Sequence, residues 1–317
     1  MPDSMWFKRI ISTQYTGLCN RLEGLALCFA VQELFGHAVC LDWPETAWLQ
    51  VEGARRWKYN PLDKLFGTKI RDPDAETFYR LGHRRILIQR GTMGGDPAIV
   101  ERVYHDTMAR LHLRPESRDR LLAYLAAVGN ALLVGVHIRR GDFQGGDGQT
   151  YDIHSARHPQ VPTWWYGYAM DRVQRQFGNV LFLLCHNNLD VEEERALRQR
   201  FPVLPSLADG RYNSDGGHAS TSNPVLDLFA LACCPILIAT PMSTFSHCAA
   251  NVLGPPSLAL QPLPVMQRTQ PGLGVTTLYG HRSPAWFTSL REQTAFAPLA
   301  PDAAIPDPGS GVHCKWL

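Results

Sequence analysis

Two adjacent arginines at the end of an apolar stretch are the residues best suited to chemistry in this sequence. Residues 134–142 read Val-Gly-Val-His-Ile-Arg-Arg-Gly-Asp, so a predicted strand leads directly into His137, Arg139 and Arg140. A guanidinium group is always charged and offers a planar fork of donors that matches phosphate oxygens. Ligands of open α/β sheets bind outside the carboxyl ends of the strands. The segment therefore predicts a site for a nucleoside diphosphate.

The two arginines are expected to have different roles. Neighbouring side chains of a strand point to opposite faces, so only one of Arg139 and Arg140 should face the ligand. The other would be structural, with Asp142 as a candidate partner. His137 could contact a ribose or a phosphate, although a histidine at a strand end is as often structural. The alternative, that both arginines make surface ion pairs, is disfavoured by the apolar strand before them.

A second polar group follows another apolar stretch. Pro241-Met-Ser-Thr-Phe-Ser246 lies between a predicted strand, 235–240, and a predicted helix that runs to about Leu253. Free N–H groups and the dipole at a helix N-terminus favour an anion. The hydroxyls of Ser243, Thr244 and Ser246 add donors, of which ordinary helix capping explains only one. This cluster is a second candidate contact for a diphosphate.

Two further segments contribute candidates. Asp227 lies in an apolar predicted helix, where a buried carboxylate needs a partner such as a strand-end arginine. Alternatively, it occupies the exposed first turn of that helix, favoured by the dipole. In Thr16-Gly-Leu-Cys-Asn-Arg-Leu22, Gly17 would allow a sharp turn and Asn20 would open a helix. The dinucleotide and P-loop fingerprints are absent, which favours a site split between the two halves of the chain.

The motifs give no support for a metal or for a serine nucleophile. Asp72-Pro-Asp74 is the one Asp-x-Asp sequence, and its proline makes it read as a turn. Two arginines and a helix N-terminus could neutralise a diphosphate without Mg²⁺. The G-x-S-x-G elbow of serine hydrolases is absent. We therefore expect neither a metal nor another cofactor.

Alternating strands and helices must position these residues. A predicted strand at 7–13, a helix at 20–35 and a strand at 38–43 open the chain as a β-α-β unit. After a stretch of weak periodicity, helices are predicted at 99–111 and 116–128, and the alternation returns from residue 131. The elements predicted there are strands at 132–138, 180–185 and 235–240, and helices at 163–177, 191–201 and 224–234. We expect an N-terminal domain at 1–130, a second domain at 131–297 and a poorly ordered Pro/Ala/Gly-rich tail at 298–317.

Length and composition agree with two globular domains. The chain has 317 residues, 45% of them apolar, and a net charge of +2, which gives no argument for a nucleic-acid partner. No apolar run reaches the roughly 18 residues that span a bilayer. The eight cysteines lie mostly in apolar runs, as reduced thiols do. These features favour a protein of the cytoplasm or of the inner face of the membrane.

Three motifs, taken in order, resemble those of the fucosyltransferase superfamily that uses GDP-fucose, in a bacterial type. This superfamily includes α1,2-, α1,6- and protein O-fucosyltransferases. The motifs are His137-Ile-Arg-Arg-Gly-Asp142, Asp227-Leu-Phe-Ala-Leu-Ala-Cys-Cys234 and Ser243-Thr-Phe-Ser246, and Gly17-Leu-Cys-Asn-Arg-Leu22 is similar to an early loop of these enzymes. The resemblance implies an α/β fold of the GT-B type, with two Rossmann-like doubly wound domains facing across a cleft. The second domain would bind the donor, the first would lie on the acceptor side, and transfer would be inverting and independent of metal.

The resemblance also implies roles for individual residues. Arg139 would hold the β-phosphate as the catalytic cation, His137 would lie near the ribose or phosphate, and Arg140 would brace the site. The remaining donor-binding residues would be Asp227, Ser243, Thr244, Phe245, Ser246, Gly17 and Asn20.

Two departures from the α1,6 branch bear on function. An acidic pair of that branch is replaced by Asn187-Asn188, which puts nucleotide recognition by this loop in doubt. A glutamate of that branch is replaced by Asp147, the candidate general base. Asp147 lies in Gly145-Gly-Asp-Gly148, so it is alternatively a turn residue, with the departing phosphate taking the proton.

The expected function is transfer of L-fucose from GDP-fucose to a glycan, such as a bacterial surface polysaccharide or oligosaccharide. Acceptor specificity is expected in residues 44–100 and 209–223. Two alternatives stay open: a transferase for another nucleotide-activated sugar, and a non-catalytic sugar-nucleotide or glycan-binding protein of the same fold. The sequence does not indicate an oligomeric state.

Overall fold

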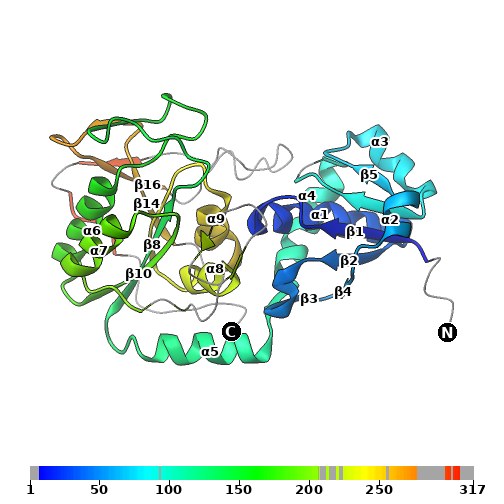
Figure 1. The fold of residues 1–317 in the computed structure, drawn as a ribbon, viewed down its shortest axis with the longest axis horizontal. Coiled ribbons are helices and arrows are strands. Elements are labelled where there is room, and N and C mark those ends of the chain that lie inside the picture. The colour runs from blue at the N-terminus through cyan, green and yellow to red at the C-terminus, as the bar shows by residue number, and fades with distance from the viewer. Residues whose placement is uncertain are drawn as a thin grey trace. The chain divides into compact units, whose positions relative to one another are not determined.

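The computed structural model divides into two compact units (Figure 1). Among the described residues, unit 1 extends to Ser117 and unit 2 begins at Arg118, inside helix α5 (Pro115–Ala126), whereas the sequence placed the boundary after Asn130. The structure describes residues 7–92, 94–205, 207, 212–213, 219–220, 224–254, 257–276, 297–300 and 303–307.

Unit 1 is built on a parallel sheet in the order β4-β2-β1-β6-β5. The predicted opening β-α-β unit is present as β1 (Arg9–Thr13), α1 (Leu18–Phe35) and β2 (Ala38–Asp42). Gly36 ends α1 with a φ of 69°, a conformation in which glycine has no Cβ penalty. The other elements of the unit are η2 (Pro44–Ala47), β3 (Leu49–Val51), β4 (Ala54–Arg56), α2 (Pro61–Phe66), β5 (Thr68–Ile70), α3 (Ala75–Arg80), η3 (Leu81–His83), β6 (Ile86–Gln89), α4 (Pro97–Ala109) and β7 (Leu111–Leu113).

Two buried ion pairs organise the part of unit 1 that the sequence left as loops and short helices. Arg21 on α1 pairs with Glu45 at 2.5 Å and lies over the ring of Trp43. Arg9 on β1 pairs with Asp63 at 2.7 Å. Removing one partner of such a pair leaves an uncompensated buried charge, so these pairs hold the segment tightly to α1 and β1.

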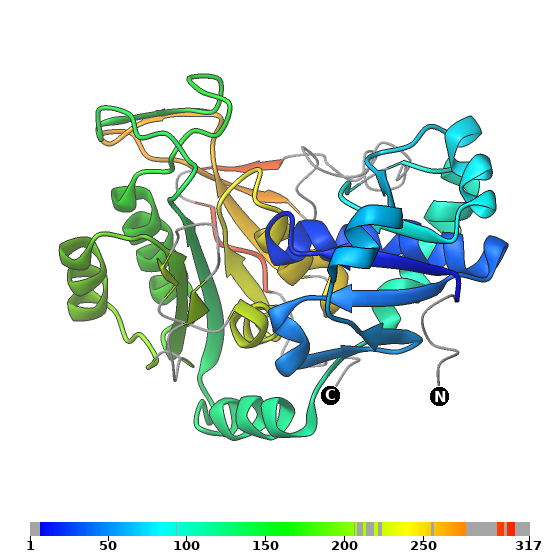
Figure 2. The same ribbon diagram turned by 45° about the vertical axis from the view of Figure 1, so that its right-hand side comes forward.

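Unit 2 contains a six-stranded sheet in the order β10-β8-β13-β14-β16-β17. The first four strands are parallel, β16 pairs with β14 in the antiparallel direction, and β17 pairs with β16 in the antiparallel direction. Figure 2 shows this order as a change of colour from green through yellow to orange and red across the sheet. The strands are β8 (Leu132–Arg139), β10 (Val180–Asn187), β13 (Ile236–Ile238), β14 (Leu258–Pro262), β16 (Leu273–Thr276) and β17 (Ala297–Leu299), and the helices are α6 (Thr163–Phe177), α7 (Val191–Arg200), α8 (Pro224–Ala232), α9 (Thr244–His247) and the π-helix η4 (Cys248–Leu253).

The central strand β8 presents two different faces. Val134, Val136 and Ile138 join a core cluster with residues of α6, such as Tyr166. The alternate residue Gly135 faces α8, because a Cβ atom there would lie 2.8 Å from the Leu231 side chain. His137 and Arg139 follow the parity of Gly135, so they leave the strand on the α8 side.

Three strands and the tail differ from expectation. The sequence left β14, β16 and β17 unassigned and treated the chain from Pro298 as poorly ordered. In the structure, Leu299 is paired with Leu273 in the sheet, and Ile305 is 2% exposed. This expectation is therefore wrong for the described part of the tail, whose apolar side chains complete the core of unit 2. The tail residues at 301–302 and 308–317 lie outside the described residues.

Short pairings complete unit 2. Strands β9 (Thr150–Asp152) and β15 (Val265–Gln267) are antiparallel. Of the expected specificity loop 209–223, only β11 (Tyr212–Asn213) and β12 (Ala219–Ser220) are among the described residues. All seven described cysteines are buried free thiols, as predicted. Among the helices that the structure describes, none is long and apolar enough to cross a bilayer.

Candidate functional site

Arg139 is the last residue of β8 and the more accessible of the two motif arginines. Its side chain is 32% exposed, and both its Nε and its Nη2 contact Asp142 Oδ1, at 3.0 and 2.9 Å. Burial alone would raise the pKa of Asp142, but the Arg139 charge and hydrogen bond lower it overall. The partner of Asp142 is therefore Arg139, and the expectation that the structural arginine would pair with Asp142 is wrong. Because this ion pair is half-exposed, exchanging Asp142 for another anion would cost Arg139 little free energy.

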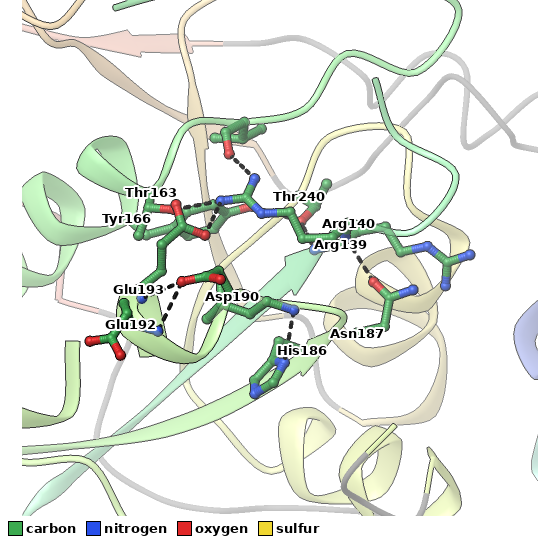
Figure 3. Close-up of polar contacts among 12 residues, drawn as sticks. Arg139, Arg140, Thr163, Tyr166, His186, Asn187, Asp190, Glu192, Glu193 and Thr240 are labelled. Carbon is green, nitrogen blue, oxygen red and sulfur yellow. Dashed lines mark hydrogen bonds and ion pairs between the residues drawn. The ribbon is translucent and has the colours of Figure 1, made fainter. Parts of the chain in front are cut away.

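Arg140 extends in the opposite direction and is buried (Figure 3). Its guanidinium donates to Val161 O and to Thr163 Oγ1, each at 2.5 Å, and lies 3.6 Å from Glu193. Its backbone N–H donates to Asn187 Oδ1 at 2.8 Å. With these partners, Arg140 fits the bracing role, because binding a phosphate would require it to leave them.

His137 forms a compact cluster with the start of α9. Its Nδ1 lies 2.7 Å from Ser246 Oγ, and its ring stacks on Phe245 with a centroid distance of 4.9 Å. Burial, with contributions from Arg139 and His186, lowers the pKa of His137 to about 3. The imidazole is therefore neutral at physiological pH, and in this pair of neighbouring residues the positive charge lies on Arg139.

The helix that the sequence predicted to run to about Leu253 is present, as the four residues of α9 and the π-helix η4 that continues them to Leu253. Ser243 precedes α9 without a side-chain capping bond, and Ser246 uses its hydroxyl on His137. Thr244 is half-buried at the first turn. The hydroxyls of Ser243 and Thr244 stay candidate donors for an anion.

Asp227 is buried in the first turn of α8, and it interacts with a residue that the sequence did not suggest. Burial raises the pKa of the Cys185 thiol, and the charge of Asp227 and its hydrogen bond with the thiol raise it further. Cys185 lies opposite His137 in the pairing of β10 with β8. Asp227 is therefore a buried residue that contacts β10 next to the candidate site, and it does not lie on an exposed helix turn.

Asp147 has the geometry of a turn residue. Its Oδ1 accepts hydrogen bonds from Gln149 N, Thr150 N and Thr150 Oγ1 at 2.9 to 3.0 Å, and these bonds lower its pKa. A carboxylate with a lowered pKa is a weaker base. Glycines 145, 146 and 148 of the same loop line a cavity of about 430 Å³ together with Arg140 and Trp164.

Asn187 and Asn188, which stand where the α1,6 pattern has an acidic pair, have structural roles at the end of β10. Asn187 ends β10 and accepts the Arg140 N–H, as described above. Asn188 has a φ of 54°, in the left-handed region that asparagine tolerates better than most residues. Both asparagines therefore fit structural roles at the carboxyl end of β10.

Gly17 and Asn20 lie in unit 1, at the start of α1. Gly17 has a φ of −57°, which any residue can adopt, so the prediction of a glycine-dependent turn is wrong. Helix α1 begins at Leu18, so Asn20 lies within its first turn and donates to Thr16 Oγ1 at 3.1 Å. Their contact with a donor stays a prediction.

Two residues at the site were missed. The Thr240 hydroxyl bonds to the backbone of β8 and to Tyr166 of α6 (Figure 3). A threonine at the carboxyl end of the predicted strand 235–240 was the available signal.

The described residues contain no cluster of three or more His, Cys, Asp or Glu side chains that could hold a metal.

Comparisons with known proteins relate the chain to other structures at the level of the fold. No family model and no curated protein matches the sequence. The structure of a point mutant of Arabidopsis thaliana FUT1 in complex with GDP is similar, with 10% identity, a TM-score of 0.52, and coverage of 89% of this chain and 78% of that chain. Fucosyltransferase NodZ from Bradyrhizobium gives 16% identity, coverage of 80% and 94%, and a TM-score of 0.44. POFUT1 in complex with GDP-fucose gives 9% identity, coverage of 79% and 95%, and a TM-score of 0.43.

The comparison with FUT1 confirms the predicted fold class, and with it the resemblance inferred from the motifs at the level of the fold. Each unit contains the parallel sheet with crossover helices that this class requires. The chain therefore has the two-unit, Rossmann-like α/β fold of the GT-B type that is found in this fucosyltransferase.

Proposed function

We propose that the protein is an inverting, metal-independent glycosyltransferase that moves L-fucose from GDP-fucose to a hydroxyl of a glycan. The observation that carries the proposal is Arg139, a partly exposed cation at the carboxyl end of β8, beside the buried and neutral His137. The shared fold with a fucosyltransferase in complex with GDP supports it. A bacterial surface polysaccharide or oligosaccharide is the proposed acceptor.

Arg139 would act on the leaving group. Departure of the nucleotide puts negative charge on the β-phosphate while the sugar becomes oxocarbenium-like. A fixed guanidinium stabilises that charge more in the transition state than in the ground state, and this difference accelerates the reaction. The half-exposed pair with Asp142 keeps the guanidinium at the strand end without binding it strongly.

The proton of the acceptor hydroxyl would go to the departing phosphate. The alternative base, Asp147, has a lowered pKa and uses one oxygen in three hydrogen bonds of its own turn. A phosphate that gains charge as the sugar leaves becomes more basic at the moment when the proton must move. Arg140 and Asp227 would support the strand ends, and Ser243, Thr244, Gly17 and Asn20 would contact the donor.

A nucleotide panel with a turnover assay tests the function. We expect GDP to raise the melting temperature of the purified protein, with UDP, ADP and CMP having little effect. GDP-fucose should be consumed in the presence of an oligosaccharide panel, with a fucosylated product seen by mass spectrometry.

Other outcomes would favour the alternatives. The asparagines at 187–188 are the observation that favours another nucleotide-sugar, and stabilisation by UDP, ADP or CMP in place of GDP would support that reading. Stabilisation by GDP without turnover on any acceptor would indicate a binding protein and contradict the transferase.

A further inference from the structure

The backbone at the tip of β8 lacks a strand partner on its β13 side. Strand β13 pairs with β8 only from Ile236 to Ile238, opposite Val134 to Val136. His137 and Arg139, the residues of the candidate site, therefore lie beyond the last pair of this ladder. Strand β10 pairs with both residues on the other side, so on the β13 side their backbone depends on the group that takes the place of the missing strand.

The Thr240 side chain replaces it. Continued by two residues, the register would place Thr240 opposite Ile138. Ala239 N–H donates to Leu260 O, so the backbone of Ala239 faces β14. The backbone groups of its neighbours, Ile238 and Thr240, therefore face β8. Backbone groups at such a position would bond to the residues on either side of Ile138. The Thr240 hydroxyl makes these bonds instead: it donates to His137 O and accepts from Arg139 N–H, each at 2.9 Å.

The hydroxyl is fixed by a third bond. Tyr166 on α6 lies 2.7 Å from Thr240 Oγ1. Because the Thr240 proton is given to a carbonyl, which can only accept, Tyr166 must donate its own proton. Both side chains are fully buried, so water does not compete for these bonds. One donor and two acceptor positions of a single hydroxyl are thus all used.

Helix α6 also fixes the other side of the strand tip. Thr163, one turn before Tyr166, accepts from the Arg140 guanidinium, and Asn187 accepts from the Arg140 N–H. The peptide units on both sides of the Arg139 Cα atom are therefore fixed by side chains of β10, α6 and the segment after β13 (Figure 3).

We propose that Thr240 is a positioning residue: its hydroxyl, held by Tyr166, takes the place of the missing strand and sets the direction in which Arg139 reaches a diphosphate. The proposal rests on the proposed function, because it assumes that Arg139 is the group that meets the ligand. Thr240 itself is enclosed beneath the strand end and acts through Arg139.

A double-mutant cycle with GDP as the probe tests this role. We expect Thr240→Val to weaken GDP binding, measured by calorimetry, about tenfold, because it leaves the Arg139 N–H and the His137 carbonyl unpaired. Thr240→Ser keeps the hydroxyl and should stay within about threefold of the wild type. In an Arg139→Ala background, Thr240→Val should change GDP affinity less than about twofold, because residues that act through one another are not additive.

Controls separate positioning from loss of stability. Val173→Ala removes buried volume from the same helix as Tyr166, and should lower the melting temperature without changing GDP affinity. If Thr240→Val does not fold, Tyr166→Phe enters the same cycle, since it removes one bond of the hydroxyl and leaves both bonds to β8.

The outcomes distinguish the two proposals. An unchanged GDP affinity of Thr240→Val, or an equal loss with and without Arg139, would overturn the positioning role and leave the proposed function intact. An Arg139→Ala variant that binds GDP like the wild type would overturn the positioning role, and one that also turns over GDP-fucose like the wild type would overturn the proposed function as well.

Discussion

At the scale of single residues, the two arginines of the candidate site differ in how firmly their guanidinium groups are held. Arg140 is held by Val161, Thr163 and Asn187, whereas Arg139 contacts a half-exposed carboxylate. The neighbouring imidazole of His137 has a pKa lowered to about 3 by burial and carries no charge at neutral pH. Of the two motif arginines, Arg139 is therefore the one that an incoming phosphate would meet.

Asp147→Asn distinguishes the two routes for the acceptor proton. An asparagine oxygen can accept the same bonds from Gln149 and Thr150, but it cannot take up a proton. Because the departing phosphate is the proposed proton acceptor, we expect turnover within about threefold of the wild type. If Asp147 were the general base, its loss would lower the rate about a hundredfold or more. A fall of that size in kcat, with GDP affinity unchanged, would return the base role to Asp147.

At the scale of the elements, periodicity predicted most of the β-α alternation of both units, and α6 was predicted with its observed bounds, Thr163–Phe177. These elements are long or strongly apolar, so local pattern and tertiary structure agree. Strands β14, β16 and β17 were missed because each is short and forms by pairing with a distant segment.

Side-chain partnerships in the site were harder to foresee. Strand alternation predicted that Arg139 and Arg140 point in opposite directions, and the choice of Arg139 as the residue that faces the ligand came from the family resemblance. The contact of Asp227 with Cys185 joins residues from different elements, as does that of Thr240 with Tyr166, and spacing along the chain contains no information on either. Such contacts depend on how helices pack on the sheet.

Gly135→Ala tests the close packing of α8 on β8. The added Cβ atom would lie 2.8 Å from both the Leu231 and the Leu237 side chains in the buried core. We expect a loss of about 1–3 kcal/mol in the free energy of unfolding, measured by urea denaturation.

Gly167→Ala is the matched control in α6. Its Cβ atom would meet only Arg200 Nη1, at 3.4 Å, and alanine favours a helix interior. This variant should be neutral or more stable by up to about 1 kcal/mol. Equal stability of the Gly135→Ala protein and the wild type would contradict the close approach.

At the scale of the whole molecule, buried neutral histidines make stability depend on pH. Burial lowers the pKa of His137 from 6.5 to about 3 and that of His247 from 6.5 to about 4. Below pH 6.5 the unfolded chain therefore binds more protons than the folded one, and stability falls as the pH falls toward 4. Well above that pH these two groups contribute no pH dependence.

Urea denaturation between about pH 4.5 and 7 measures this effect. Each buried histidine should contribute a slope of up to about 1.4 kcal/mol per pH unit. His247→Gln should reduce the slope of the stability curve by about the contribution of one proton. A His247→Gln curve parallel to that of the wild type would show that His247 is not kept neutral by burial.

The central claim is that the Arg139 guanidinium meets the diphosphate of the donor, and the steady-state rate of Arg139→Ala tests it most directly. We expect kcat with GDP-fucose to fall by about two to three orders of magnitude, with an unchanged melting temperature. Arg195→Ala, at an exposed position of α7 in the same unit, should keep the wild-type rate. A folded Arg139→Ala protein that turns over GDP-fucose like the wild type would contradict the account.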